Sequence, residues 1–257
     1  MPSAAGLYYF SHLEEERGLA PVILLHGAGG NCLYWPPAVR RMQGIRIYAP
    51  DLPGHGKSPG IGRQSIPDYA ASLLDFLHEL TISKAIIVGH SMGGAIALHL
   101  AIHRPKHVLG LVLLGAGARL RVTPELLDNS TSSATFPMAL KFIEQNAYSD
   151  RADPRVRDLA MKQMAVVRPT VLHGDFLACN AFDEFGAVNR VRAPALVICG
   201  KEDRFTPLRY AEYLANTMKN ARLLRVENAG HMVMLEKPDI VSHALADFIG
   251  RIPYQPG

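Results

Sequence analysis

The chain has 257 residues, of which 48 % are hydrophobic and 19 % are charged, so it can form one large globular domain or one domain with an insertion. The formal net charge is only +4, and aspartates interrupt the densest basic group (151, 155 and 157), which argues against a nucleic-acid partner. The three cysteines are widely spaced, and no segment resembles a signal peptide or a membrane span. We therefore expect reduced thiols, a cytoplasmic protein and no membrane partner.

Most of the predicted strands are short runs of Val, Ile and Leu without polar alternation. Such runs are typical of strands that are buried on both faces of a parallel sheet. They span residues 22–25, 45–49, 85–88, 108–114 and 195–199. Residues 222–226 alternate in character, which indicates a strand nearer the sheet edge, and residues 7–10 predict an antiparallel strand at the start.

Helix signals separate these strands. Ser65-Ile66-Pro67-Asp68 and Thr206-Pro207 are typical helix starts. Asp239 precedes a last helix, whose predicted buried face consists of Ile240, Val241, Ala244, Leu245, Phe248 and Ile249. Alternating strands and helices with right-handed crossovers predict a mostly parallel, doubly wound α/β sheet.

Residues 118–188 interrupt this alternation, because they contain helical patterns (154–167 and 169–178) but no convincing strand. We expect an inserted helical cap at 118–188 and a core formed by 1–117 and 189–257. The large apolar residues of the cap are expected either to face the space beneath it or to form its own small core. As candidate substrate-binding residues the sequence offers Trp35, Phe136, Met138, Phe176 and Met232.

The sequence Gly89-His90-Ser91-Met92-Gly93 matches the pattern G-x-S-x-G. It follows the predicted strand at 85–88 and begins the predicted helix Met92–His103, which is the context in which this motif exposes a nucleophilic serine. Glycines at 89 and 93 remove side chains that would clash across the sharp turn, and the helix N-terminus favours a developing negative charge. The sequence therefore predicts Ser91 as a nucleophile.

A serine hydroxyl needs a base, and the base needs an orienting carboxylate. His231 follows the predicted strand at 222–226, and Asp203 follows the one at 195–199. Both loops are expected at the carboxyl edge of the sheet, where Ser91 also lies. Glu202 is the alternative acid. The predicted catalytic residues are Ser91, Asp203 and His231.

An oxyanion requires preorganised N–H donors. The backbone N–H of Met92, just after the nucleophile, is one candidate, and that of Ala28 in the glycine-rich loop 26–30 is the other. This loop departs from the dinucleotide pattern G-x-G-x-x-G, because Cys32 stands at the third glycine. His99, His103 and His107 have helical metal-binding spacing, but a basic helix C-terminus is common, and neither a metal nor a cofactor is expected.

These motifs, together with Asp51-Leu52-Pro53-Gly54-His55-Gly56-Lys57-Ser58, resemble the α/β-hydrolase superfamily over residues 22–249. Within it the pattern is most similar to small carboxylesterases and enol-lactonase-like hydrolases. The resemblance implies an α/β-hydrolase fold, a Ser…Asp…His order of the triad, and a variable cap at 118–188.

The leading hypothesis from the sequence is hydrolysis of small to medium carboxylic esters through an acyl-enzyme, in a monomer or a homodimer. The same triad also serves enol-lactone hydrolysis, C–C bond hydrolysis and acyl transfer, and Arg168 is a candidate for holding a substrate carboxylate. A ligand receptor without turnover is a third, non-enzymatic hypothesis, which the intact triad disfavours.

Overall fold

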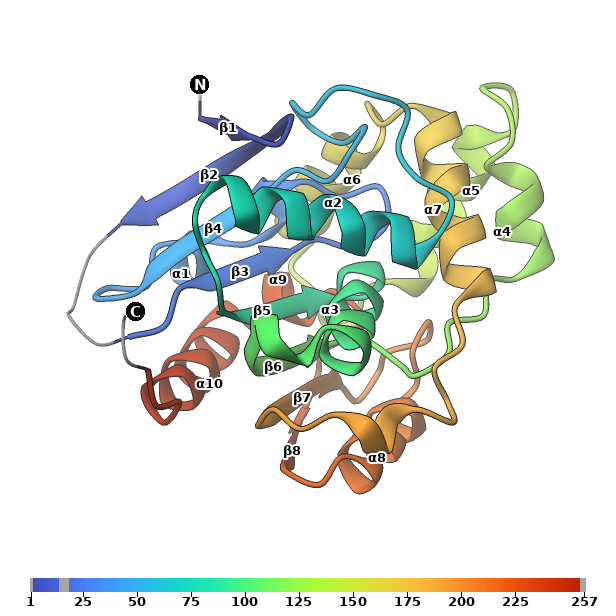
Figure 1. Ribbon diagram of the computed structural model, residues 1–257. Coiled ribbons are helices and arrows are strands. Elements are labelled where there is room, and N and C mark those ends of the chain that lie inside the picture. The colour runs from blue at the N-terminus through green and yellow to red at the C-terminus, as the bar shows by residue number, and fades with distance from the viewer. Residues whose placement is uncertain (1, 14–18, 255–257) are drawn as a thin grey trace.

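The computed structural model describes residues 2–13 and 19–254 (Figure 1). Its eight-stranded sheet has the order β1-β2-β4-β3-β5-β6-β7-β8. Strand β2 runs antiparallel to β1 and β4, and the other neighbouring pairs are parallel. The strands are β1 (Ser3–Ala4), β2 (Leu7–Leu13), β3 (Val22–Leu25), β4 (Arg46–Pro50), β5 (Ala85–His90), β6 (Val108–Leu114), β7 (Ala195–Gly200) and β8 (Ala221–Val226).

Helices connect the strands. The α-helices are α1 (Pro37–Arg40), α2 (Ile66–Glu79), α3 (Met92–His103), α4 (Pro124–Asn129), α5 (Phe136–Asn146), α6 (Pro154–Met164), α7 (Pro169–Ala181), α8 (Leu208–Thr217), α9 (Val233–Glu236) and α10 (Pro238–Gly250). Short 3-10 turns are η1 (Cys32–Tyr34), η2 (Pro105–His107) and η3 (Val188–Arg190). Among the helices of 2–13 and 19–254, none combines the length and apolar character needed to cross a bilayer.

The sheet is covered on both faces, because side chains of each central strand alternate between two apolar clusters. In β3, Ile23 and Leu25 join the cluster that contains the buried residues of α2, α3 and α8. Val22 and Leu24 join the other cluster, which includes Val39 of α1 and the buried face of α10. This arrangement confirms the predicted mostly parallel, doubly wound sheet.

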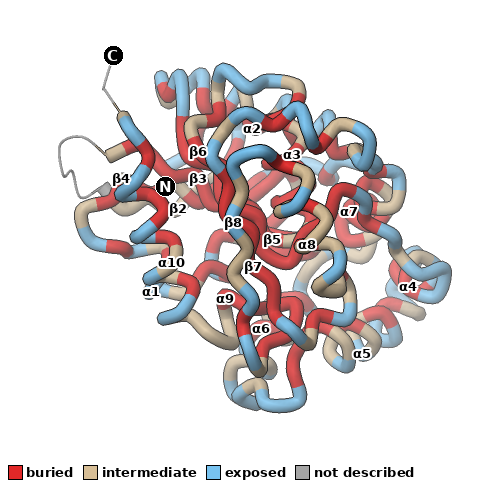
Figure 2. The backbone as a smooth tube through the Cα atoms, turned by 90° about the horizontal axis from the view of Figure 1, so that it is seen from below, coloured by how far each residue is buried: buried red, intermediate tan, exposed pale blue. Residues whose placement is uncertain are grey.

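The strands predicted to be central are buried, and the strand predicted nearer the edge is more exposed. All six residues of β5 and of β7 are buried, whereas in the edge strand β8 only Val226 is (Figure 2). Strand β2 pairs antiparallel with β4, as expected of the first run. The two-residue strand β1 was not predicted, because so short a segment carries no periodic signal.

Two helix starts show where the local sequence signals predict the structure correctly and where they do not. The Ser65 side chain accepts a hydrogen bond from the Asp68 backbone N–H at 3.2 Å and caps α2 as predicted. The last helix instead begins at Pro238, one residue before Asp239. Its predicted buried face holds for Val241, Leu245, Phe248 and Ile249, but Ile240 is 46 % exposed. This part of the prediction is wrong, because Ile240 lies about 100° around the helix from the buried Val241 and so outside the apolar face.

The segment between β6 and β7 carries helices α4 to α7. In Figure 1, α4, α5 and α7 lie at the right of the view, beyond the arrowheads of β3 and β5. The two ends of the segment meet, because Arg119 and Asp183 form an isolated antiparallel bridge and an ion pair at 2.5 Å. The segment therefore leaves and rejoins the sheet at one place.

Candidate active site

Ser91 lies at the sharp turn between β5 and α3. Its backbone has φ 53° and ψ −116°, a conformation that costs a non-glycine residue of order 1–3 kcal/mol and that the surrounding structure must impose. The Ser91 N–H donates to the Leu114 carbonyl at 3.0 Å, which fixes the turn to β6. Ser91 also lines a cavity at this edge of the sheet, together with residues of the segment 118–188.

Two glycines of the motif make this turn sterically feasible. A Cβ at Gly89 would collide with the backbone of Gly93, and a Cβ at Gly93 would collide with the carbonyl oxygens of Leu25 and His26. The first clash lies within the turn, and the second lies between α3 and the loop after β3. The absence of side chains thus brings the start of α3 against the glycine-rich loop.

His231 and Asp203 come together at the same edge of the sheet. The loop after β7 carries Asp203, the loop after β8 carries His231, and His231 Nδ1 lies 2.9 Å from Asp203 Oδ2. Both side chains are buried, and His231 lines the cavity next to Ser91. With Nδ1–H donating to the carboxylate, Nε2 is the ring nitrogen left to accept a proton.

Asp203 is held as a carboxylate by its own loop. Its Oδ1 accepts the backbone N–H groups of Phe205 and Thr206 at 2.9 and 2.8 Å, and its Oδ2 accepts the Thr206 hydroxyl at 2.7 Å. Burial alone raises the pKa of this carboxyl, but the charge of His231 and these hydrogen bonds outweigh burial and lower the pKa below its usual value. Glu202 points elsewhere, since its Oε2 accepts the Asp150 N–H at 3.3 Å.

Both predicted oxyanion donors belong to segments that lie next to Ser91. Met92 is the first residue of α3, so its N–H has no partner within the helix. Ala28 and its neighbour Gly27 both line the cavity. A Cβ added to Gly27 would lie 3.1 Å from Ser91 Cβ, so this loop is close to the nucleophile. Neither N–H donates a hydrogen bond to another residue within 2–13 and 19–254.

Two buried histidines, His26 and His90, hold the backbone around this centre. His26 Nε2 accepts the Leu52 N–H at 3.0 Å, and His90 Nε2 lies 3.0 Å from the His231 carbonyl oxygen. Burial, followed by the neighbouring histidine, lowers the pKa of each to about 3, so both rings are neutral. His90 thereby donates to the backbone of His231 and fixes the segment that carries it.

Asp175 of α7 is a residue that sequence reasoning missed. It is fully buried, and its Oδ2 accepts the Gly29 backbone N–H at 2.8 Å, next to Ala28. The same oxygen lies 2.8 Å from His55 Nε2, and Oδ1 accepts the Tyr69 hydroxyl at 2.5 Å. Burial lowers the pKa of His55, but the charge and hydrogen bond of Asp175 outweigh it and raise the pKa. The ion pair thus joins α7 to the loop after β4, and the Gly29 hydrogen bond joins α7 to the glycine-rich loop.

The cavity at Ser91 has a volume of about 180 Å³ and is lined mainly by apolar side chains. Of the predicted substrate-binding residues, Phe176 and Met232 line it. Trp35, Phe136 and Met138 do not, which corrects the prediction. Trp35 is fully buried under the sheet and Phe136 packs in the same apolar cluster, whereas Met138 is 57 % exposed on α5. Lining residues not predicted for the site include Tyr34, Leu120, Leu126 and Ile143.

Arg168 does not line the cavity. It is the N-cap residue of α7, and its guanidinium donates to the carbonyl oxygens of Gly54, at 3.1 Å, and Gly60. The interpretation of Arg168 as a substrate-carboxylate ligand is therefore wrong. Two other arginines, Arg121 and Arg204, belong to the cavity lining instead.

Comparison with known proteins agrees with this geometry. The model of the family described as "alpha/beta hydrolase fold" matches residues 20–238, and the chain belongs to that family. A pimeloyl-[acyl-carrier protein] methyl ester esterase from Aromatoleum aromaticum is 29 % identical, covering 89 % of this chain and 97 % of the relative. A 2-hydroxymuconate semialdehyde hydrolase from Pseudomonas putida is 28 % identical, covering 96 % and 92 %.

A solved structure gives the same result for the fold. The enol-lactonase from Burkholderia xenovorans LB400 superimposes with a TM-score of 0.87 at 22 % identity, covering 95 % of this chain and 96 % of that chain. Family and relatives together support hydrolase activity, and the resemblance inferred from the sequence motifs is confirmed.

Proposed function

We propose that the protein hydrolyses carboxylic esters of small to medium size through an acyl-enzyme on Ser91. The observation that carries the proposal is that His231, paired with Asp203 at 2.9 Å, lines the same cavity as a strained serine at the start of α3. A base oriented by a buried carboxylate, next to a nucleophile, is the arrangement needed for acyl transfer.

In the proposed reaction, His231 Nε2 takes the proton from the Ser91 hydroxyl as its oxygen attacks the ester carbonyl. The N–H groups of Ala28 and Met92 stabilise the oxyanion, with the positive end of α3 behind it. His231 then gives the proton to the leaving alcohol. Water attacks the acyl-enzyme with His231 as base, and Ser91 is regenerated when the acid leaves.

Asp203 and Asp175 act in this proposal as positioning residues. Asp203 keeps the proton on His231 Nδ1 and stabilises the imidazolium that forms in each step. Asp175 holds the Gly29 N–H, at 2.8 Å, and thereby the backbone direction of Ala28. Because a misplacement of about 1 Å can cost on the order of 100-fold in rate, a buried anchor beside the oxyanion donor supports catalysis indirectly.

The segment 118–188 is proposed as the cap that selects the substrate. It contributes Leu126, Phe142, Met164 and Phe176 to the cavity, which are apolar. Such a lining favours an apolar acyl or alcohol group, and about 180 Å³ limits the size of the group that fits.

A second candidate reaction is hydrolysis of an acidic enol-lactone by the same residues. Arg121 and Arg204 in the cavity lining are the observation that favours it, because a guanidinium can pair with a substrate carboxylate. Both arginines already contact protein groups: Arg204 pairs with Asp150 at 2.8 Å, and Arg121 donates to the Asn180 carbonyl at 3.3 Å. A neutral ester therefore remains the leading substrate class.

The test is a chain-length series of p-nitrophenyl esters and a set of neutral and acidic lactones, assayed with wild type and with Ser91→Ala. We expect ester hydrolysis to fall by several orders of magnitude in the variant. The oxyanion site should still support a small residual activity. Undiminished ester hydrolysis would refute the assignment of Ser91. Higher kcat/KM for acidic lactones than for any ester, lost in Ser91→Ala, would keep the nucleophile and replace the substrate class.

A further inference from the structure

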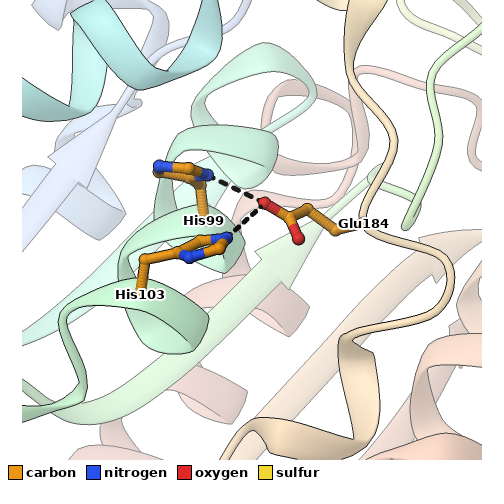
Figure 3. Close-up of side chains that lie close together, drawn as sticks. All are labelled: His99, His103 and Glu184. Carbon is orange, nitrogen blue, oxygen red and sulfur yellow. Dashed lines mark hydrogen bonds and ion pairs between the residues drawn. The ribbon is translucent and has the colours of Figure 1, made fainter.

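His99, His103 and Glu184 form a cluster outside the cavity. His99 and His103 lie four residues apart in the last two turns of α3, with their ring centroids 4.4 Å apart. Glu184 follows α7, more than eighty residues later in the chain. Its Oε1 lies 2.9 Å from His99 Nδ1 and 2.8 Å from His103 Nε2 (Figure 3).

We propose that His99, His103 and Glu184 form a structural Zn²⁺ site. Two imidazole nitrogens and a carboxylate oxygen are a common zinc ligand set. The three ligand atoms lie within 4.8 Å of one another. Tetrahedral coordination at about 2.0–2.2 Å separates ligand atoms by about 3.4 Å, so small side-chain rotations are sufficient to accept the ion.

The backbone already holds the three side chains in register. The Glu184 N–H donates to the Ala118 carbonyl at 2.8 Å, and the preceding residue, Asp183, pairs with Arg119. The histidines belong to a regular helix whose opposite side is packed in the apolar core. Binding of the ion would therefore not require a mobile segment to become ordered, so little binding free energy would be lost to ordering the site.

Exposure and charge also suit a metal ion. The side chains of His103, His99 and Glu184 are 34 %, 18 % and 13 % exposed. An ion can thus enter from solvent and keep water as a fourth ligand. Burial lowers the pKa of His99, against the opposing effect of its hydrogen bond to Glu184, and a metal ion requires the ring in its neutral form.

The site joins two parts of the molecule that matter for the proposed reaction. Helix α3 begins directly after Ser91, and Glu184 lies where the segment 118–188 returns to the sheet. None of the three ligands lines the cavity, so the ion would stabilise the fold and not contact the substrate. The sequence could not reveal it, because the third ligand is Glu184 and not His107, which instead contacts the Ser83 carbonyl at 3.0 Å.

The test is a titration of chelator-treated, dialysed protein with Zn²⁺ by calorimetry and thermal unfolding, together with Co²⁺ absorption. We expect one ion per chain, a higher Tm, and the intense d–d bands of tetrahedral Co²⁺. His103→Ala and Glu184→Gln should each weaken binding at least about tenfold, the size of effect seen even for outer-shell partners. His107→Ala is the matched control and should bind as wild type does.

Two results would overturn the proposal. One is the absence of saturable Zn²⁺ binding by wild type. The other is binding that survives both His103→Ala and Glu184→Gln unchanged, because the ion would then lie elsewhere, for instance at His231. Circular dichroism of each metal-free variant shows whether it is folded, and the Co²⁺ spectrum of a folded variant reports the loss of a ligand directly.

Discussion

Replacing Asp203 with asparagine tests how the proposed base is oriented. Asp203 Oδ1 accepts two backbone N–H groups, from Phe205 and Thr206, while Oδ2 faces His231 Nδ1 at 2.9 Å. If the asparagine oxygen takes the Oδ1 position, both backbone bonds are kept and the NH₂ group faces His231. The reverse orientation leaves two buried donors unsatisfied, at roughly 1–3 kcal/mol each.

The first orientation therefore prevails, and His231 Nδ1 must then accept a hydrogen bond. The ring proton moves to Nε2, the nitrogen that should take the proton from Ser91. The corresponding change in a serine protease triad lowers kcat by about 10⁴-fold, which equals about 5.4 kcal/mol at 1.36 kcal/mol per tenfold. We expect a fall of similar size in kcat for Asp203→Asn, with a preserved fold.

The assay is ester hydrolysis over a range of substrate concentrations, with circular dichroism to confirm folding. Glu202→Gln is the matched control, because it makes the same chemical change at the adjacent carboxylate and should retain wild-type activity. An Asp203→Asn variant within about tenfold of wild type, or a Glu202→Gln variant equally impaired, would refute the reasoning from hydrogen-bond orientation.

Four further predictions concern Asp175, Gly93 and Phe176. Asp175→Asn should lower kcat by roughly 100-fold with little change in KM, because the loop of the oxyanion donor loses its ionic anchor; an unchanged kcat contradicts this role. Because the pKa of His55 is raised in the folded protein, its pair with Asp175 contributes its full stabilisation below about pH 6.5. This contribution is lost as the pH rises through the folded-state pKa of His55. The loss of unfolding free energy in Asp175→Asn, measured by urea unfolding, should therefore become smaller as the pH rises through that pKa. Gly93→Ala should cost about 3 kcal/mol or more, a fall in Tm of roughly 6–12 °C, because its Cβ meets the Leu25 carbonyl oxygen; an unshifted melting curve would show that the loop can move. Phe176→Leu should raise kcat/KM for longer esters relative to acetate by about tenfold, and an unaltered chain-length profile would place the acyl group elsewhere in the cavity.

Local patterns were sufficient to predict the sheet. The apolar runs of β3, β5 and β7 are buried on both faces, and no competing signal lies within them. The meeting of His231 with Asp203 also followed from the sequence, because loops after parallel strands share one edge of the sheet. These inferences need only strand direction and order, which short segments encode.

The contacts of individual large side chains could not be predicted in this way. Trp35, Phe136 and Met138 are large and apolar, but only packing decides whether such residues are buried, exposed or in contact with a cavity. Asp175 lies in the middle of α7, where its 146-residue separation from Gly29 gives no local signal. Buried polar residues whose partners are distant in the sequence are therefore the part of the site that only the structure reveals.

The central claim is that Ser91 forms the covalent intermediate. The most direct measurement is mass spectrometry of the protein after reaction with a fluorophosphonate, which traps an activated serine, followed by peptide mapping. We expect one adduct per chain on the peptide that contains Ser91, coincident with loss of esterase activity and absent in Ser91→Ala. Modification of a different residue, or full inactivation of esterase activity without an adduct on Ser91, would contradict it.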